Sequence, residues 1–555
     1  MHWQYTTSTS PTDLKQLTDL LLSHRGVKSQ SQKEAFFHPK HPVELTLEEV
    51  GISAEHMDMA VRRIQQAKER NEEVVIFGDY DADGICSTAI LWEALRSIGV
   101  IAKPFLPHRE KHGYGLTLRS LASVLEEHKP QLLITVDNGI VAHAAFAELQ
   151  RLGIDTILTD HHAPEAELPV AQVVIHTTKL CGSGVAWFLA RHLSETSAQA
   201  SLDLAAIATI ADQMVLLDAN RSFVVHGMAE LRQTERIGLQ LLMAKANVLP
   251  EKISADTINY VIAPRLNAMG RLKHSLDALR LVCTTSYDRA HQLVAELNDT
   301  NVTRQELTTE MIEHAISQAE RWENEHIIIV ASEDYHEGVI GLLASKLVEE
   351  YFKPAIAISI GQKTAKASAR SIMGVNITEL IRQVKDDLLE AGGHPMAAGF
   401  AADPAKLTVV QQRLQVLAKA QITAEMLTPR LLVEVGLPIE LVTLSTAEEI
   451  AHFSPFGQGN PEPIISLPPA VIHMASQVGK EGKHLRLQVG LQKEGTQITL
   501  TCLAWGKGSL ATELPVGTQV ELAGCLSVNE WKNKRSLQMV VRDIHLIESE
   551  PVLRS

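Results

Sequence analysis

Between about residues 70 and 215, short β-rich runs alternate with stretches of helical character, and this alternation restricts the fold more than any other feature. The β-rich runs are residues 74–77, 132–136, 156–158 and 173–175, and helical patterns such as 87–98 and 142–152 lie between them. Strands that alternate with helices of this length favour βαβ units and a mainly parallel, doubly wound sheet. The sequence therefore predicts an α/β fold for this part of the chain.

Acidic residues follow the first three of these runs and occur once more further along the chain. They are Asp79, Asp81 and Asp83 after the first run, Asp137 after the second, Asp160 with His161 and His162 after the third, and Asp212 within the apolar stretch 202–217. Open α/β sheets bind ligands at the carboxyl ends of their strands. A buried acid is costly unless it is paired or bound to a metal. We therefore expect these side chains to gather in one metal site.

The residue types of this cluster indicate its chemistry. Carboxylates with one or two imidazoles and no thiolate favour Mn²⁺ or Mg²⁺ over structural zinc, and this many acids favours two ions. Two ions about 3.5–4 Å apart activate a water and stabilise an in-line displacement at phosphorus. Alone, the first acidic loop is also compatible with a solvated turn or a Ca²⁺ loop. No P-loop, nucleophile elbow or dinucleotide fingerprint is present. The sequence predicts a metal-dependent phosphodiester hydrolase.

Composition limits the remaining possibilities. The net charge of −15 disfavours non-specific binding of polyanions unless Lys and Arg are gathered locally. The five cysteines are scattered, which disfavours a disulfide framework and a thiolate zinc site. No apolar run approaches the roughly 20 residues that cross a bilayer, and the first residues show no secretory signal. We expect a cytoplasmic protein without membrane contact.

Three further segments have recognisable patterns. Residues 286–325 contain no Gly or Pro and predict one long connecting helix or two with a short break. A second α/β unit follows, with strands at 327–330 and 355–358, a helix at 339–350 and a Gly-rich segment at 392–399. The last hundred residues contain five β-rich runs, at 471–478, 484–491, 497–504, 519–528 and 535–547, with a helical piece at 509–514. This order predicts a C-terminal β-barrel of the OB type.

Several motifs resemble a known family. Asp-Tyr-Asp-Ala-Asp-Gly at 79–84, Val-Asp-Asn-Gly at 136–139 and Asp-His-His at 160–162 resemble the DHH phosphoesterase family. The segments 107–116, 263–271, 297–305, 368–371, 392–400 and 455–461 resemble its RecJ branch and follow the order of that branch along nearly the whole chain. The resemblance implies an N-terminal extension (1–50), a DHH domain (51–285), a connecting helix (286–325), a DHH-associated domain (326–425), a linker segment (426–464) and an OB-fold domain (465–555).

The resemblance also implies roles for the clustered residues. The implied metal ligands are Asp81, Asp83, Asp137, His161 and Asp212, with Asp137 and Asp212 as bridges between two cations. Asp79, Asp160 and His162 are the implied supporting catalytic residues, and His162 contacts the scissile phosphate or assists the leaving group. One position departs from the family: Phe77 stands where many members have a ligating His. The resemblance then implies that Asp79 or water takes the place of this imidazole.

Candidate contacts to DNA lie in three parts of the chain. Hydroxyl, guanidinium, imidazole and Gly-exposed amide groups are suitable donors to phosphate oxygens. In the second α/β unit they are Ser368, Arg370, Ser371, Gly393 and His394, and in the DHH domain Arg109, His112, Arg265 and Arg271. In the OB segment the candidates are Lys483, Arg486, Trp531, Lys532, Lys534 and Arg535. The alternatives are a simple turn at the Gly pair and solvated charged hairpins in the barrel.

The family implies a single-stranded-DNA-specific exonuclease that works 5′ to 3′, releases nucleoside 5′-monophosphates and acts in DNA repair and recombination. It implies two divalent cations, Mn²⁺ or Mg²⁺, a monomer, and a helicase and a single-strand-binding protein as partners. One alternative is a DHH-type oligoribonuclease or cyclic-dinucleotide phosphodiesterase, which needs no OB domain. Another is a catalytically silent RecJ-like scaffold, which would tolerate loss of the acids, whereas all four acidic segments are intact.

Overall fold

The structure is a computed structural model of the 555-residue chain, and it describes residues 1–493, 496–532 and 534–547. Its contacts divide the chain into two compact units. One comprises Thr46–Asp212 and Gly227–Pro429, and the other Met1–Leu45, Gln213–His226 and Arg430–Ser555. The six domain boundaries inferred from the sequence stay predictions. Within the expected OB domain, residues 494–495, 533 and 548–555 lie outside the described residues.

The first sheet of the larger unit has five parallel strands in the order β3-β2-β4-β5-β6. They are β2 (Val74–Phe77), β3 (Ala102–Phe105), β4 (Leu132–Val136), β5 (Asp155–Asp160) and β6 (Val173–His176). Four of them correspond to the predicted β-rich runs. The sequence pattern misses β3, because this edge strand is short, contains a proline and is largely unburied.

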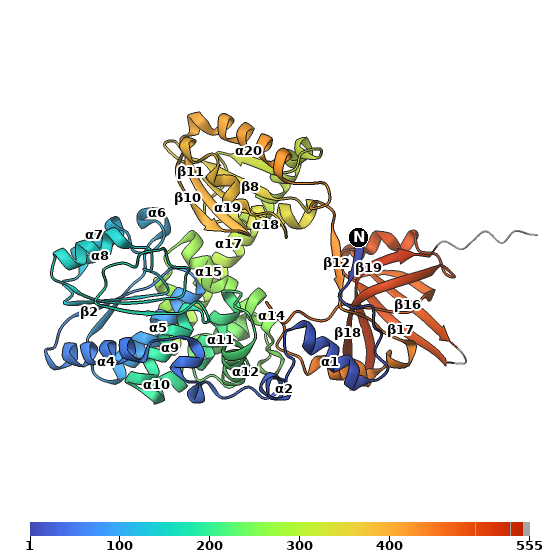
Figure 1. The fold of residues 1–555 in the computed structure, drawn as a ribbon, viewed down its shortest axis with the longest axis horizontal. Helices are drawn as coiled ribbons and strands as arrows, with labels where there is room; N and C mark the ends of the chain where they lie inside the picture. Colours follow the sequence, from blue (N-terminus) through green and yellow to red (C-terminus); the bar gives the residue numbers. More distant parts are fainter. Residues whose placement is uncertain (494–495, 533, 548–555) are drawn as a thin grey trace, which may run out of the picture. The chain divides into compact units, whose positions relative to one another are not determined.

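Helices cover both faces of this sheet (Figure 1). α4 (Ala54–Glu69), α5 (Ala82–Ser97) and α9 (Gly182–Leu193) lie on one face, and α7 (Leu118–Glu127) and α8 (His143–Arg151) on the other. The doubly wound parallel sheet is therefore confirmed. The chain passes from β2 to β3 on one side and then to β4 on the other, so the strand order reverses between β2 and β4. Open α/β sheets bind ligands at this type of position.

The rest of the larger unit continues with helices and a second, mixed sheet. Its further helices are α3 (Leu47–Val50), α6 (Arg109–His112), α10 (Glu195–Gln199), α11 (Leu202–Ala211), α13 (Ile237–Lys245), α14 (Ala255–Thr257), α15 (Ala263–Leu272) and α16 (Leu276–Cys283). Helix α12 (Asp218–Arg232) begins in the smaller unit and ends in the larger one. The long helix α17 (Tyr287–Ala319) confirms the predicted connection, although a 3₁₀ turn at Glu320–Trp322 ends it before residue 325.

The second sheet has the order β10-β11-β9-β8-β7, in which only β7 and β8 are parallel. Its strands are β7 (Ile328–Ser332), β8 (Ala355–Ile360), β9 (Ala365–Arg370), β10 (Leu388–His394) and β11 (Ala397–Ala402), with helices α18 (Ile340–Tyr351), α19 (Ile377–Arg382) and α20 (Leu407–Gln421). The second α/β unit is therefore confirmed. Gly392 and Gly393, for which a turn was the alternative, lie within strand β10.

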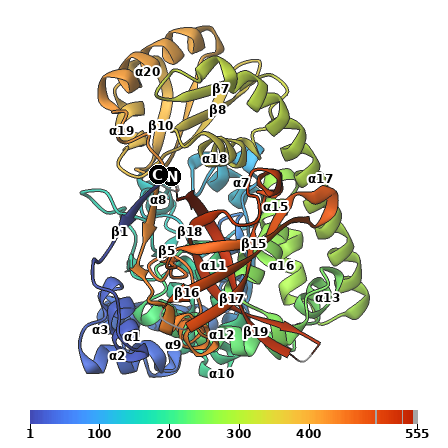
Figure 2. The same ribbon diagram turned by 90° about the vertical axis from the view of Figure 1, so that its right-hand side faces the viewer.

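The smaller unit contains the C-terminal barrel, whose strands are coloured orange to red in Figure 2. They are β15 (Ala470–Val478), β16 (His484–Lys493), β17 (Thr496–Ala504), β18 (Gln519–Trp531) and β19 (Lys534–Leu546), with a 3₁₀ helix at Gly508–Thr512. β19 pairs in parallel with β17 and antiparallel with β18, and these pairings close the barrel. The predicted OB-type barrel is confirmed, and β13 (Val435–Gly436) and β14 (Ile465–Ser466) extend its sheet.

N-terminal segments complete the smaller unit. β1 (His2–Tyr5) pairs with β12 (Arg430–Val433), and α1 (Leu14–His24), α2 (Gln30–Phe37) and α21 (Leu444–Ala451) share an apolar core with the barrel strands. The buried guanidinium of Arg25 donates to Glu434 at 2.8 Å and to Asn460 at 2.6 Å. Residues 1–45 of the N-terminal extension therefore fold together with the barrel. Among the described residues, no helix combines the length and the apolar character needed to cross a membrane.

Candidate metal centre

The acidic residues meet at the carboxyl end of the parallel sheet, as predicted. Asp81 is the N-cap of α5, and its carboxylate accepts hydrogen bonds from the backbone N–H groups of Asp83 and Gly84, both at 3.0 Å. Asp137 directly follows β4 in the left-handed region, with φ of 62°, and Asp212 is the C-cap of α11. The point where the strand order reverses therefore carries the acids of separate segments.

One ring nitrogen of His161 lies among three carboxylates. Its Nε2 is 3.1 Å from Asp137 Oδ1, 3.6 Å from Asp212 Oδ2 and 3.8 Å from Asp83 Oδ2. Within the described part of the chain, Nε2 of His161 and Oδ1 of Asp137 are buried and have no hydrogen-bond partner. Buried polar atoms are nearly always satisfied. A cation between these atoms would satisfy both, so the residues fit a metal.

Among the described residues, the possible ligand atoms form three overlapping groups, one of which combines Asp137 with Asp160, His161 and His162. Those of Asp83, His161 and Asp212 lie within 4.8 Å of one another, and so do those of Asp79, Asp81 and Asp137. Because Asp137 also approaches His161, its carboxylate lies where it can bridge two cations. Asp212, the other residue expected to bridge the cations, belongs to only one group, with Asp83 and His161.

Burial and mutual repulsion explain the electrostatics of the cluster. Burial, reinforced by Asp81, raises the pKa of Asp79 to about 8, and burial, reinforced by Asp83, raises that of Asp212 to about 8. The pKa of Asp137 is raised well above its ordinary value, chiefly by burial. So many carboxylates cannot all ionise without a counter-charge. Burial lowers the pKa of His161, which favours the neutral imidazole that binds metals.

The N-terminus of α9 holds one of these acids. The backbone N–H groups of Gly182 and Ser183 donate to the Asp83 carboxylate, each at 2.7 Å. A Cβ on Gly182 would lie 2.5 Å from both Cβ and Oδ1 of Asp137, so only glycine fits there. Neither Gly182 nor Ser183 is among the residues predicted from the sequence. The available signal is the Gly-Ser-Gly that opens a helix after a strand, which is a typical anion-binding position.

We predict that Gly182→Ala weakens Mn²⁺ binding by about 10- to 100-fold, the usual cost of disturbing a residue that supports a ligand. The added methyl group has to displace Asp137 and the backbone donor to Asp83. Calorimetric titration with Mn²⁺ measures the effect. The matched control is Gly184→Ala on the same helix, where the three atoms nearest to an added Cβ are side-chain atoms of Leu180, at 3.0 to 3.5 Å. Equal affinity in both variants would contradict this role of Gly182.

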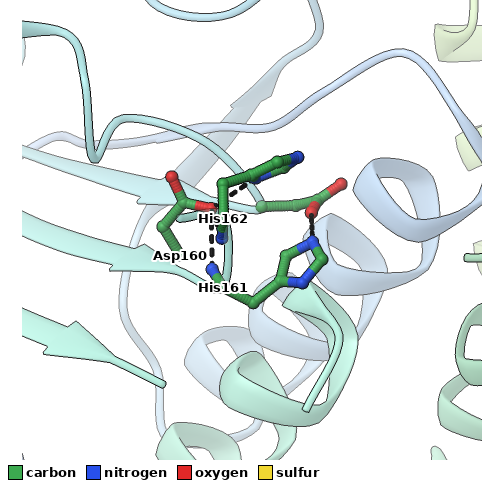
Figure 3. A group of neighbouring side chains, drawn as sticks. Asp160, His161 and His162 are labelled. Atoms are coloured by element: carbon green, nitrogen blue, oxygen red, sulfur yellow. Dashed lines mark hydrogen bonds and ion pairs between the residues drawn. The ribbon is translucent and has the colours of Figure 1, made fainter. Parts of the chain in front are cut away.

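Asp160 and His162 form a second arrangement beside the cluster (Figure 3). Oδ1 of Asp160 accepts from Nδ1 of His162 and from the backbone N–H of His161, both at 2.7 Å, and Oδ2 accepts from the backbone N–H of Ile140 at 2.9 Å. Both oxygens are engaged, so Asp160 orients its neighbours. Although burial opposes the shift, the hydrogen bond from His162 to Asp160 raises the pKa of His162 to about 9.

Two residues that the sequence analysis did not select contact this site. The hydroxyl of Tyr114 lies 3.0 Å from Nε2 of His162. Asn267 on α15 accepts a hydrogen bond from the backbone N–H of Ala82 at 2.7 Å, which supports the aspartate loop. The two residues lie in the segments 107–116 and 263–271. These segments resemble the family, but only the structure shows which of their side chains contact the site.

Phe77 contributes no ligand to the centre. Its ring is fully buried in an apolar cluster and stacks on Phe105, with 5.5 Å between the ring centroids. The carboxylate of Asp79 lies within ligand distance of Asp81 and Asp137. The geometry is therefore compatible with Asp79 in the place of the missing imidazole.

Several of the predicted phosphate-binding residues line one groove of about 570 Å³ in the larger unit, and these are Arg109, Arg271, Ser368 and Arg370. Tyr114 and Gly392 line the same groove. Arg271 donates to the carbonyl of Gly338 at 3.1 Å, and Arg370 donates to the hydroxyl of Ser368 at 3.2 Å. The fold thus brings residues from the domain of the first sheet and from the domain of the second sheet to one basic groove, which Tyr114 also lines.

The other predicted residues of this unit do not line the groove. Nδ1 of His112 accepts from the backbone N–H of His108, and the buried hydroxyl of Ser371 donates to the carbonyl of Val375 at 2.6 Å. Arg265 donates to the carbonyl of Val261 at 2.7 Å. Gly393 and His394 end strand β10. For His112 and Ser371 these bonds are local, so a structural role accounts for the side chains.

The predicted residues of the barrel lie at its surface. Trp531 is 69% exposed at the end of β18. Lys483 pairs with Glu481 at 3.0 Å, and Arg535 pairs with Glu448 at 2.8 Å. The remaining candidates are exposed, and they are Arg486, Lys532 and Lys534. The barrel therefore presents an exposed aromatic side chain among cations at the β18–β19 hairpin.

Comparison with known proteins identifies three family models along the chain. They are the DHH family, N-terminal domain, over residues 73–211, the DHHA1 domain over 324–420 and the RecJ OB domain over 433–543. The single-stranded-DNA-specific exonuclease RecJ of Bacillus subtilis is 33% identical over 545 residues, which cover 95% of this chain and 68% of that protein.

Solved structures agree with these matches. The crystal structure of RecJ from Thermus thermophilus in complex with Mn²⁺ matches with a TM-score of 0.81 and 30% identity, over 99% of this chain and 80% of that one. The same protein in complex with Mg²⁺ matches with a TM-score of 0.77 and 28% identity, over 99% and 79%. The order of the three family models is the order of the folded domains, and the chain belongs to the RecJ family.

Proposed function

We propose that this chain is a single-stranded-DNA-specific 5′→3′ exonuclease, which hydrolyses phosphodiester bonds with two divalent cations, Mn²⁺ or Mg²⁺, and releases nucleoside 5′-monophosphates in DNA repair and recombination. One observation carries the proposal: a buried cluster of carboxylates around His161 lies near a basic groove to which Tyr114 contributes. The names of the matched relatives support the substrate class.

The proposed ligands are Asp81, Asp83, Asp137, His161 and Asp212. Asp79 replaces the imidazole that many family members have at position 77. When bound, the cations supply Lewis-acid activation of a water and neutralise charge that develops at phosphorus. The backbone donors of Gly182 and Ser183 fix the Asp83 carboxylate. Asp81 is fixed in the same way by the first turn of α5. The protein therefore orients the ligands before a substrate arrives.

His162 is the proposed proton donor. Asp160 holds Nδ1 of His162, and this leaves Nε2 directed to the hydroxyl of Tyr114. The raised pKa of His162, about 9, keeps the imidazole protonated at neutral pH. A proton at Nε2 can therefore pass to the 3′-oxygen that leaves when the phosphodiester bond breaks.

The basic groove is the proposed site for the terminal nucleotide. The guanidinium groups of Arg109, Arg271 and Arg370 suit phosphate oxygens in charge and geometry. Arg109 also lies over the ring of Tyr80, 5.3 Å from its centroid. Hydrogen-bond donors from both domains of the unit thus converge where the 5′ end of a strand would bind.

We predict that Trp531→Ala with Lys534→Ala raises the KM for long single strands while kcat changes little. The exposed indole offers a stacking surface, and loss of such stacking costs about 1–3 kcal/mol per base. Steady-state kinetics on oligonucleotides of increasing length measures the effect. Truncation of the barrel is unsuitable, because the N-terminal helices share its core. An unchanged KM on the longest strand would contradict the proposed role of the barrel.

Substrate choice distinguishes this proposal from its alternatives. Purified protein with Mn²⁺ is offered single-stranded DNA, blunt duplex DNA, short oligoribonucleotides and a cyclic dinucleotide. The proposal expects rapid release of 5′-mononucleotides from the single strand alone. Preference for the short oligoribonucleotide or the cyclic dinucleotide would favour a different DHH activity. Inactivity on all four would favour a silent scaffold.

We further propose that the chain works as a cytoplasmic monomer together with a helicase that supplies single strands and a single-strand-binding protein. A helicase would supply the free strand that the proposed substrate requires when the DNA is a blunt duplex. Light scattering of the purified protein tests the monomer, and a stable dimer would contradict it.

A further inference from the structure

Two arginines outside the groove lack acidic partners. Arg265 on α15 donates through one Nη to the carbonyl of Val261, and Arg304 on α17 donates through one Nη to Asn301 at 3.0 Å. The Nε atom of each is buried and has no hydrogen-bond partner in the described part of the chain. Neither forms an ion pair with a described carboxylate. α15 and α17 pack against each other.

This arrangement is unfavourable without a ligand. A buried donor that stays unsatisfied destabilises the fold, and it does so more strongly when the donor is charged. Burial lowers the pKa of Arg265, and burial together with the charge of Arg265 lowers the pKa of Arg304. An anion between them would accept from both Nε groups and remove the repulsion. The chemistry of the pair therefore fits a phosphate.

Electrostatic interactions extend this pair into a row of guanidinium groups. Arg271 interacts with Arg304, with the groove residues Arg109 and Arg370, and with Asp81 of the metal centre. Arg271 itself lines the groove, so it connects the groove electrostatically with Arg304. In a chain of net charge −15, so many interacting arginines are a local exception, and two of them, Arg265 and Arg304, form no ion pair with a described carboxylate. A polyanion is the ligand that matches several cations in series.

We propose that Arg265 and Arg304 form a second phosphate site, which lies outside the groove and binds the DNA backbone. The terminal nucleotide then occupies the groove, and the following part of the strand passes Arg271 and contacts Arg304 and Arg265. This inference rests on the proposed function and adds where the remainder of the substrate lies. It also assigns Arg304, a residue of the segment 297–305, to DNA binding.

The test is the salt dependence of DNA binding by Arg265→Gln with Arg304→Gln. Binding to a long oligo(dT) and to a thymidine dinucleotide is measured with Ca²⁺ in place of Mn²⁺, across a range of salt. The slope of log affinity against log salt should fall by about 0.7 for each phosphate that the variant no longer neutralises. The loss of affinity should be large for the long strand and small for the dinucleotide, which does not reach beyond the groove.

Two controls separate binding from folding. Arg289→Gln removes a charge from the same helix, where the side chain is exposed and pairs with Asp277 at 3.5 Å, and it should leave the slope unchanged. The double variant should unfold, without DNA, at the same temperature as the wild type or a higher one, because it loses two uncompensated cations. Inorganic phosphate is added to test a free anion as the occupant.

An unchanged slope in the double variant, or an equal loss for the dinucleotide and the long strand, would overturn the inference. The inference would also be overturned if inorganic phosphate stabilises the wild type while the two arginines contribute nothing to oligonucleotide binding. If the wild type degrades single strands with Mn²⁺, these results would contradict the second site and leave the proposed function intact. A wild type that does not degrade them would contradict the proposed function itself.

Discussion

Replacing Asp137 by alanine is expected to reduce the hydrolysis of single-stranded DNA by about a thousandfold or more. The carboxylate belongs to one group of possible ligands with Asp79 and Asp81 and lies 3.1 Å from Nε2 of His161, so we expect both proposed cations to depend on it. A catalytic cation contributes several kcal/mol, and each 1.36 kcal/mol is tenfold in rate. Single-turnover rates at saturating Mn²⁺ measure the loss.

The same variant separates a catalytic role from a structural one. Alanine removes a buried carboxylate that repels its neighbours, so metal-free Asp137→Ala should be at least as stable as the metal-free wild type. Addition of Mn²⁺ should raise the melting temperature of the wild type and not that of the variant. Asp58→Ala, an exposed acid on α4, is the matched control and should behave as the wild type. Wild-type activity in Asp137→Ala would contradict the account.

The pH dependence of metal binding follows from the raised pKa values. In the metal-free protein the pKa values of Asp79 and Asp212 are about 8, against an ordinary 3.8. Between these values the folded state binds protons that the unfolded state has lost, so metal-free stability falls as the pH rises through this window. Cations must displace these protons, so Mn²⁺ affinity should rise up to about pH 8. Calorimetry in buffers of different ionisation enthalpy should detect proton release, and its absence would contradict the assigned ligands.

Replacing Asp160 by asparagine is expected to lower kcat by about 100- to 10,000-fold, the usual contribution of a positioned proton donor. The carboxylate accepts from Nδ1 of His162 and from three backbone N–H groups, and an amide reproduces only part of this arrangement. The pKa of His162 should fall, because its hydrogen bond to Asp160 is the largest contribution that raises it. The imidazole would then be poorly protonated at neutral pH.

His162→Gln is the companion variant, because it removes the proton donor and leaves Asp160 in place. Both variants should keep Mn²⁺ affinity close to that of the wild type, since neither side chain is a proposed ligand. Titration of the metal and determination of kcat and KM distinguish the two roles. Loss of Mn²⁺ affinity in Asp160→Asn, with kcat restored at high Mn²⁺, would show that Asp160 is instead a ligand.

The sequence pattern predicts the parts of the fold that depend on local periodicity. The strands before Asp79, Asp137 and Asp160 are short apolar runs bounded by acidic loops, and parallel pairing then brings their ends together. The edge strand Ala102–Phe105 lacks this pattern. The shared core of α1, α2 and the barrel joins segments far apart in the chain, and no local signal indicates it.

The site is predicted as a set of acids and imidazoles, whereas the residues that orient them come from distant segments. Gly182 contacts Asp83 and Asp137 only because α9 begins beside α5. Asn267 and Tyr114 likewise act through contacts that spacing does not encode. Ser371 shows the opposite case, since its hydroxyl bonds to the carbonyl of Val375 four residues away and does not reach the groove. The orientation of the Ser371 side chain is therefore set by its hydrogen bond to a backbone carbonyl and does not follow from its place in the motif.

The most direct test of the central claim is a time course of degradation of single-stranded DNA labelled at either end, with Mn²⁺, with Mg²⁺ and with a chelator. The account predicts that the 5′ label is released first, as a mononucleotide, that both metals support the reaction, and that the chelator stops it. Release of the 3′ label first would contradict the proposed polarity, and undiminished release in the chelator would contradict the metal centre at Asp137 and His161.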